Sequence, residues 1–482
     1  MNHSGWHRTK IVCTLGPATD PPGVIESLIG SGMDIARVNT SHGDHAGHAR
    51  RIQRIRQAAR ESGQPVAILV DLPGPKFRIG DVPGGCRRLA EGESVMLVEE
   101  GGHTGDLDIG EAGNSLPVRN PELLEALGAG ESVFLADGLI ELHVETVVPG
   151  RIKCKVVTSG TVRSGSGMNI PESSLEALVP TDDDRRHLEF ALVQEAEWVG
   201  ISFVQSAADI LRVRALLPPD TRPLLMAKIE KRKALANLDE IIEASDGVMV
   251  ARGDLGIETD LAEIPIVQKR IIAAANARAR PVVTATQMLE SMVEREHPTR
   301  AEVTDVANAA LDGTDAVMLS AETAIGMFPV HAVAMLDRVL AATEAGYGAR
   351  MMPDRKSPAV SGPDHDALCL AASRLAANLG ARAIIVPVRT MAAALNIARF
   401  RPQAPVIVIT DCVQLYMSLA LVHGVAPLFS EVSGVVGVEA WIARAREWLF
   451  AHGLAQPDDR AVLLYASDAG GGESDSLQVV RL

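Results

Sequence analysis

Aromatic residues and cysteines are scarce in this chain of 482 residues. Aromatic side chains make up only 3% of it, so its core must be packed from aliphatic residues. The cysteines are few, odd in number and far apart, and none forms a CxxC pair: Cys13, Cys86, Cys154, Cys369 and Cys412. A disulfide framework is therefore not expected, and a reduced, cytoplasmic protein is the simplest interpretation.

Long apolar runs are also missing. No stretch of about 18 apolar residues occurs, so no membrane-spanning helix is expected. The first ten residues, MNHSGWHRTK, lack the apolar core of a signal peptide. The formal net charge of −15 argues against nucleic acid and anionic membranes as partners. No GxxxxGK[ST] motif and no protein-kinase HRD or DFG set is present, so an enzyme of this sequence that handles phosphate must gather positive charge in some other way.

What the chain does have is a regular alternation of two patterns. Short apolar runs rich in β-branched residues recur, and amphipathic stretches typical of helices lie between most of them. Eight such runs occur, at residues 11–16, 35–41, 67–72, 198–204, 224–230, 247–254, 281–287 and 316–322. Continuous apolar strands that alternate with helices indicate a parallel sheet covered on both faces. Eight units predict an α/β fold of the (β/α)8 TIM-barrel type, with its chemistry at the carboxyl ends of the strands.

Two regions break this rhythm. Residues 79–169 are rich in Gly, Pro and Val and alternate with period two, which predicts a β domain inserted after the third strand. A linker with Pro and Ser follows residue 350, and αβ alternation then resumes. We therefore predict a barrel formed by residues 1–78 and 170–350, an inserted β lid at 79–169 and an open α/β domain at 351–482.

Polar side chains stand at the carboxyl end of nearly every predicted barrel strand. They are Arg37, Asn39, Ser41, Asp71, Lys228, Glu230, Arg252, Asp254, Thr286, Ser320 and Glu322. Residues two apart in a strand share a face, so Lys228 with Glu230, and Arg252 with Asp254, are expected to point the same way. Such charges need a partner when buried. They could form ion pairs that merely close the barrel, or they could bind a metal or a ligand.

Two of these carboxylates suggest a metal. Glu230 and Asp254 end neighbouring predicted strands, and a pair of carboxylates suits Mg²⁺ or Mn²⁺, with water and substrate phosphate as the remaining ligands. Asp254 belongs to the tripeptide Arg252-Gly253-Asp254 in VMVARGDLGIE. An adhesion role would need a secreted, disulfide-bonded protein, which the composition does not favour. The exposed amides near Gly253 could instead hold a carboxylate or phosphate.

Several motifs together resemble the pyruvate kinase family over nearly the full length of the chain. They include TLGPAT, DIARVNTSHG, DLPGPKFRIG, ADGLI, GMNIP, AKIE, DGVMVARGDLGIE, ATQMLESM and IARFRPQAPVIVIT. The long block HPTRAEVTDVANAALDGTDAVMLSAETAIG is highly specific. The resemblance implies a barrel with a β lid and a C-terminal αβ domain, which is also the layout predicted from pattern.

The resemblance also implies a reaction and a set of roles. The reaction is phosphoryl transfer from phosphoenolpyruvate to ADP, giving pyruvate and ATP, in a protein that is usually a homotetramer. Glu230 and Asp254 would hold Mg²⁺ or Mn²⁺, and Lys228 and Arg37 would neutralise the phosphoryl group. The backbone of Gly253 and Asp254 with Thr286 would hold the carboxylate. Ser320 and Glu322 would relay a proton to the enolate, and His42, Arg78 and Asp137 would face the nucleotide.

One departure from the family pattern bears on K⁺. Many relatives that need K⁺ carry Thr and Glu where this chain has Leu72 and Lys76, although Asn39, Ser41 and Asp71 match K⁺ ligands. A lysine ammonium is a tethered monovalent cation. We therefore expect activity without added K⁺, unless Lys76 faces solvent.

At other positions this chain lacks a positive charge or an effector-binding motif that relatives often carry. Gln205, Ser166 and Glu189 stand where relatives often carry Arg, Lys and Lys. The C-terminal domain keeps Arg389 and Thr390 but lacks a Ser-Gly pair, so fructose 1,6-bisphosphate is doubtful as an effector; another phosphorylated effector, or none, stays open.

Two further interpretations concern histidines and the function class. His45 and His48 are expected on a solvated helix face, with His42 alone near the nucleotide. A metal-dependent lyase or aldolase acting through pyruvate enolate, or a catalytically silent metabolite sensor, are the alternatives to a kinase. A lyase would need neither Asp137 nor the lid, and a sensor would not need the full charged set.

Overall fold

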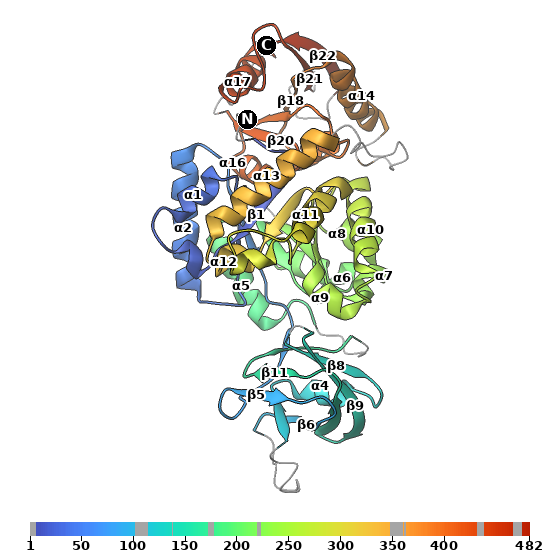
Figure 1. Ribbon diagram of the computed structural model, residues 1–482. Coiled ribbons are helices and arrows are strands. Elements are labelled where there is room, and N and C mark those ends of the chain that lie inside the picture. The colour runs from blue at the N-terminus through green and yellow to red at the C-terminus, as the bar shows by residue number, and fades with distance from the viewer. Residues whose placement is uncertain are drawn as a thin grey trace.

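The computed structural model describes residues 6–101, 114–136, 138–171, 178–218, 223–347, 360, 363–430, 438–465 and 475–482. Three parts lie in a row (Figure 1): the C-terminal region at one end, a barrel in the middle and a β-rich lid at the other end. No helix in these ranges is long and apolar enough to cross a membrane.

The central part is a closed barrel of eight parallel strands, as the alternation predicted. Its strands are β1 (Lys10–Thr14), β2 (Ile35–Asn39), β3 (Ala67–Asp71), β13 (Trp198–Ile201), β14 (Leu224–Ile229), β15 (Gly247–Ala251), β16 (Val282–Ala285) and β17 (Ala316–Leu319). The order around the barrel is β1, β17, β16, β15, β14, β13, β3 and β2. Nearly every strand residue is buried because helices cover the outside and side chains fill the inside.

Helices surround these strands (Figure 1). They are α1 (Val24–Gly30), α2 (His45–Ser62), α5 (Asp182–Val193), α6 (Ala207–Arg214), α7 (Arg232–Ala236), α8 (Leu238–Ala244), α9 (Arg252–Glu258), α10 (Ile264–Ala277), α11 (Arg300–Asp312), α12 (Ala321–Ala324) and α13 (Pro329–Tyr347). Local signals explain where α11 begins and ends. Thr299 and Glu302 form a capping box at its start, and Gly313 adopts a left-handed φ of 92° at its end.

The strands end earlier than the sequence indicated. The predicted strand at 247–254 ends at Ala251, and α9 begins at Arg252. The predicted strand at 316–322 ends at Leu319, and α12 follows. The predicted strands included the polar residues at these junctions, whereas the backbone hydrogen bonds that define each strand end before them. Glu230 and Thr286 therefore lie just beyond β14 and β16, and Asp254 and Glu322 lie in the first turns of α9 and α12.

The lid lies between β3 and α5 and is built from β sheets. One sheet has the order β4 (Phe77–Arg78), β12 (Gly167–Asn169), β8 (Ser132–Leu135), β9 (Ile140–Val148), β10 (Arg151–Val156), β6 (Ser94–Glu99) and β7 (Ser115–Val118). A second sheet pairs β11 (Gly160–Arg163) with β5 (Cys86–Leu89). Burial alternates along β8 and β10, and a single apolar cluster fills the lid. The predicted fold, a barrel with an inserted β lid, is therefore confirmed in this part of the molecule.

The C-terminal region is an open α/β sheet. Its strand order is β20 (Val425–Phe429), β19 (Val406–Thr410), β18 (Ala383–Pro387), β21 (Arg460–Tyr465) and β22 (Ser476–Arg481), and only β22 is antiparallel. The helices of this region are α14 (Pro363–Leu379), α15 (Met391–Ala398), α16 (Val413–Ser418) and α17 (Val438–Ala451). The sequence did not single out β20, which contains Pro427. Proline is tolerated there because β20 is an edge strand.

The C-terminal region packs on the amino ends of the barrel strands. Trp198, at the start of β13, donates its indole N–H to the Ser418 carbonyl at 3.3 Å. One hydrophobic cluster joins barrel-interior residues such as Met226 and Met249 with Leu419 and Ala394 of the C-terminal region. The carboxyl ends of the strands consequently face the lid.

Candidate active site

A cavity of about 450 Å³ lies between the carboxyl ends of the barrel strands and the lid. Lys228, Glu230, Asp254 and Arg37 line its barrel side together with Asn39 and Ser41. The lid side includes Arg78, Ser166 and the turn that follows β11. The structure thus brings together most of the charged residues that the strand ends predicted.

Asp71 is the centre of the ion-pair network at the cavity floor. Its carboxylate accepts from Arg37 Nε at 2.8 Å and lies 3.2 Å from Lys228 Nζ. Only 1% of the Asp71 side chain is exposed. Burial raises the pKa of Asp71, but the cations Lys228 and Arg37 outweigh it and hold this pKa below its usual value. Asp71 is therefore a buried anion that orients both cations.

Lys228 and Glu230 point the same way, as predicted. Lys228 Nζ lies 3.0 Å from Glu230 Oε1 and donates to Ser202 Oγ at 2.7 Å. Burial lowers the pKa of Lys228, yet Asp71 and Glu230 outweigh it and raise this pKa above its ordinary value. The lysine consequently remains an ammonium at neutral pH.

Glu230 differs from Asp71 in the direction of its pKa shift. Burial, helped by the nearby Asp254 charge, raises the pKa of Glu230 even though Lys228 opposes the shift. Its second oxygen accepts from the Phe203 backbone amide at 2.7 Å. Two carboxylates in one partly enclosed space repel each other, which a bound cation would relieve.

Ser202 and Phe203 were missed from the sequence. Ser202 is 2% exposed, accepts from Lys228 and donates to the Leu72 carbonyl at 2.6 Å. Phe203 has a left-handed φ of 57°, which is uncommon for an aromatic residue. The only sequence signal was a hydroxyl after an apolar strand. Backbone strain of this kind cannot be read from residue type.

The prediction that Arg252 and Asp254 point the same way is wrong. Arg252 begins α9, and its guanidinium contacts Asp305 at 2.6 Å and the Thr286 carbonyl at 2.5 Å. A residue spacing of two points to one side in a strand but to different sides in a helix. Arg252 therefore anchors the loop after β16, while Asp254 lines the cavity.

Gly253 and Thr286 form a separate contact beside the cavity. The Gly253 amide donates to Thr286 Oγ1 at 2.9 Å. Thr286 has a left-handed φ of 70° and Gln287 one of 55°, so the turn after β16 is held in a strained conformation.

Ser320 and Glu322 do not line the cavity. Glu322 is fully buried and accepts from the Ser320 amide at 2.7 Å and the Leu289 amide at 3.1 Å. Within the described residues, Ser320 Oγ is buried without a hydrogen-bond partner.

The residues matched to a K⁺ site divide into two groups. Asn39, Ser41 and Lys76 line the cavity. Leu72 is 2% exposed and belongs to the hydrophobic core, so it offers only its backbone. Lys76 is half-buried.

The predicted nucleotide side is seen in part. His42 and Arg78 line the cavity, and Arg78 donates to the Gly165 carbonyl at 3.0 Å. Asp137 lies outside the described residues. Glu189 is exposed on α5, and Gln205 lines a smaller neighbouring cavity.

The expectation that His48 is solvated is wrong. His48 is 4% exposed, and its Nε2 lies 2.8 Å from the His42 carbonyl. Burial lowers the pKa of His48. His45 is exposed, as predicted, and stacks on Phe190 with ring centroids 4.4 Å apart. The described residues include no group of three or more His, Cys, Asp or Glu that could hold a metal, so these histidines form no metal cluster.

Comparison with known proteins decides the family. The family model described as "Pyruvate kinase, barrel domain" matches residues 6–333, and the one described as "Pyruvate kinase, alpha/beta domain" matches residues 366–480. The chain belongs to the pyruvate kinase family. It is accordingly an enzyme, a kinase of glycolysis.

Curated pyruvate kinases resemble the chain over most of its length. One from Agrobacterium vitis is 38% identical over 478 residues, covering 98% of this chain and 97% of the relative. One from Methylorubrum extorquens is 40% identical over 459 residues, covering 95% and 93%. One from Sporosarcina psychrophila is 40% identical over 428 residues, covering 87% and 71%.

Proposed function

We propose that this member of the pyruvate kinase family transfers the phosphoryl group of phosphoenolpyruvate to ADP, giving pyruvate and ATP. The observation that carries the proposal is the shared wall of Lys228, Glu230, Asp254 and Arg37 in one cavity beneath the lid. In a protein of net charge −15, cations concentrated at one rim make a specific site for a phosphate.

Glu230 and Asp254 are proposed to hold the divalent cation, Mg²⁺ or Mn²⁺. The donor set fits such an ion: two carboxylates face the same cavity, and burial together with the nearby Asp254 charge raises the pKa of Glu230. Two protein carboxylates leave positions for water and substrate, as Mg²⁺ prefers. When bound, the ion would neutralise charge on the substrate carboxylate and phosphate.

The side chains around this ion are proposed to act by position and charge. Lys228 would neutralise the transferring phosphoryl group and the enolate left behind, and Arg37 would bind the same phosphate. Asp71 supports this assignment because it orients both cations from a buried site. Charge spreads over the phosphoryl oxygens in the transition state, so fixed cations stabilise it without reorganising.

Other groups are proposed to place the substrates. The backbone of Gly253 and Asp254 with Thr286 would hold the carboxylate of phosphoenolpyruvate and pyruvate. Ser320 and Glu322 would form the polar path by which the enolate gains a proton, and the buried Ser320 hydroxyl, which has no hydrogen-bond partner among the described residues, supports a role beyond packing. His42, Arg78 and Asp137 would face ADP and ATP. The lid would exclude water from the phosphoryl group.

Lys76 is proposed to make K⁺ unnecessary. Its place in the wall of the same cavity as Asn39 and Ser41 supports this, because an ammonium there supplies one positive charge. Initial rates in Na⁺, K⁺ and tetraalkylammonium buffers should agree within about twofold, and a Lys76→Glu variant should become K⁺-dependent. Strong activation of the unaltered enzyme by K⁺ would refute the proposal.

Three further proposals concern the whole protein. The domains are proposed to comprise residues 1–78 with 170–350, 79–169 and 351–482. A homotetramer is proposed from family membership, and light scattering would test it. A cytoplasmic location is supported by five cysteines that are all free thiols.

The deciding assay couples pyruvate formation to lactate dehydrogenase, with phosphoenolpyruvate, ADP and Mg²⁺ present. Pyruvate should form only when ADP is added. Pyruvate formed without ADP would mean that the phosphate ester is hydrolysed and would refute phosphoryl transfer to ADP, and binding without turnover would indicate a sensor. A Glu230→Gln variant tests the metal site in the same assay, because it keeps the size of the side chain and removes the proposed metal ligand.

A further inference from the structure

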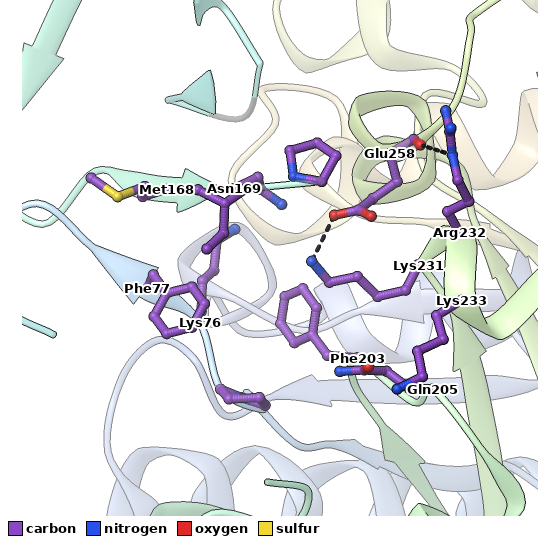
Figure 2. A pocket seen from close by; sticks show the side chains of 13 residues that line it. Lys76, Phe77, Met168, Asn169, Phe203, Gln205, Lys231, Arg232, Lys233 and Glu258 are labelled. Carbon is purple, nitrogen blue, oxygen red and sulfur yellow. Dashed lines mark hydrogen bonds and ion pairs between the residues drawn. The ribbon is translucent and has the colours of Figure 1, made fainter. Parts of the chain in front are cut away.

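A second, smaller cavity of about 90 Å³ lies beside the active-site cavity, where the lid joins the barrel (Figure 2). Lys76, Phe77, Met168 and Asn169 line its lid side, and Lys231, Arg232, Lys233 and Glu258 line its barrel side. Figure 2 shows Lys231 and Arg232 both bonded to Glu258 across this barrel side.

Glu258 makes two contacts that the proposed reaction does not require. Its Oε1 lies 2.6 Å from Lys231 Nζ, and its backbone carbonyl accepts from Arg232 Nε at 3.1 Å. The Glu258 side chain is only 3% exposed and that of Lys231 is 20% exposed. Neither residue lines the larger cavity. A carboxylate this deeply buried must be matched by a compensating charge, which Lys231 provides.

The positions of the two partners in the chain are informative. Lys231 directly follows Glu230, and Glu258 is the last residue of α9, one helical turn after Asp254. Residues four apart lie on the same side of a helix. A single ion pair therefore joins the connection that carries one cavity carboxylate to the helix that carries the other.

A second set of contacts runs from Lys231 back to Glu230. The Lys231 ammonium lies 5.6 Å from the centre of the Phe203 ring, and the Phe203 amide donates to Glu230 Oε2 at 2.7 Å. Phe203 lines both cavities and has a left-handed φ. The left-handed backbone persists only where neighbours hold it in place, and the Lys231 ammonium over its ring is one such neighbour.

The short helix α9 needs such a tether. With seven residues it has little intrinsic stability, so outside contacts must fix its position. Arg252 anchors its first residue to Asp305 at 2.6 Å, and Glu258 anchors its last residue to Lys231. Asp254 lies between these two anchors.

We propose that Glu258, acting through Lys231, is a positioning residue that sets the spacing of Glu230 and Asp254 and so the affinity for the divalent cation. This inference rests on the proposed function of those two carboxylates. Residues that support metal ligands change metal affinity about 10-fold to 100-fold when replaced. Glu258 and Lys231 touch neither substrate nor the ion in this proposal.

The test measures Mn²⁺ binding by the electron paramagnetic resonance of the free ion, with no substrate present. Glu258→Gln and Lys231→Met should each raise the Mn²⁺ dissociation constant about tenfold. The double variant should be little worse than either single one, because both remove the same ion pair. In activity assays the Mg²⁺ concentration for half-maximal rate should rise similarly, while kcat at saturating Mg²⁺ should change less.

A matched control is the ion pair of Arg56 and Glu197, at the other end of the barrel. Its atoms are 2.8 Å apart and its side chains are 20% and 6% exposed, close to the values for Lys231 and Glu258. Glu197→Gln should lower stability but leave Mn²⁺ affinity within about twofold, because the pair contacts no cavity residue.

The outcomes separate the two proposals. Wild-type affinity in both Glu258→Gln and Lys231→Met overturns the positioning role, and so does an equal loss in Glu197→Gln. Wild-type affinity in Glu230→Gln would instead overturn the metal site itself. If Glu258→Gln fails to fold, Lys231→Met decides the positioning role by itself.

Discussion

The two ends of the barrel both bury charged side chains, but they use them differently: near the lid these side chains face a cavity, whereas at the other end they pair with one another. Near the lid, Lys228, Arg37 and Glu230 line a space of about 450 Å³. At the opposite end, Arg401 contacts both oxygens of Asp315, at 2.9 and 3.0 Å, and donates to the Gly313 carbonyl at 2.7 Å. Asp315 is further engaged by the Val282 amide at 2.9 Å and the His423 amide at 3.1 Å.

The difference shows how one fold uses charge for two purposes. Ion pairs at the amino ends of the strands, such as Arg401 with Asp315, form between protein side chains and join the C-terminal region to the barrel. Cations and carboxylates at the carboxyl ends are oriented by Asp71 and Ser202 but still open on a cavity that can admit a ligand. Barrels of this type generally separate stability and chemistry in this way.

The largest expected effect follows from removing Lys228. A Lys228→Met variant should lose about three orders of magnitude in kcat, since a preorganised cation at the developing charge is removed. The coupled assay measures it. The matched control is Lys10→Met, because Lys10 is also a buried lysine, 5% exposed, but lies at the opposite end of the barrel. If Lys10→Met loses activity equally, the proposed division between the two ends is wrong.

Removing Arg401 should lower stability and leave catalysis unchanged, which is the opposite of the effect expected for Lys228. An Arg401→Met variant leaves Asp315 buried without its cation, which should lower the free energy of unfolding by about 3–5 kcal/mol. The catalytic constants of the folded enzyme should stay near those of the wild type. Urea unfolding and the coupled assay at low temperature check the two halves of this prediction. An unchanged urea midpoint would show that the Arg401 network adds no stability.

A smaller, pH-dependent effect is expected from His7, which also lies at the end away from the lid. Its ring nitrogens lie 2.9 Å from Asp34 and 2.9 Å from Asp337. Burial lowers the pKa of His7, but these carboxylates outweigh it and raise the pKa to about 9 from 6.5. The native state thus binds the proton more tightly than the unfolded state. The stabilisation is complete below about pH 6.5 and is lost as the pH rises through about 9.

The His7 contribution can be isolated by comparison with His7→Gln. Wild type should exceed the variant in unfolding free energy by up to about 3 kcal/mol at pH 6, and the difference should shrink towards pH 9.5. Denaturant titrations across this range measure it, and kcat at pH 7 should be unaffected. A difference that grows with pH would contradict the proposed charge state.

Pattern alone predicted the general layout of a barrel, an inserted β lid and a C-terminal α/β region. Eight apolar segments predicted eight parallel strands, and period-two alternation predicted the lid, because burial on two faces or on one face constrains residue type directly. The residues Lys228, Glu230 and Asp254 could also be picked out from the sequence, because a charged residue at the end of a buried apolar run is conspicuous. The C-terminal edge strand β20 was not found, since Pro427 looks like a strand breaker and its edge position is a property of the sheet.

The sequence by itself determined which side chains could carry charge into the interior and roughly where along the chain they stand. Only the tertiary structure decided which of them meet. It turned Arg252 away towards Asp305, buried His48, and joined Lys231 to Glu258 across 27 residues. The physical reason is that contact between distant residues depends on backbone direction at strand ends, which strained turns at Phe203 and Thr286 set and which residue type does not encode.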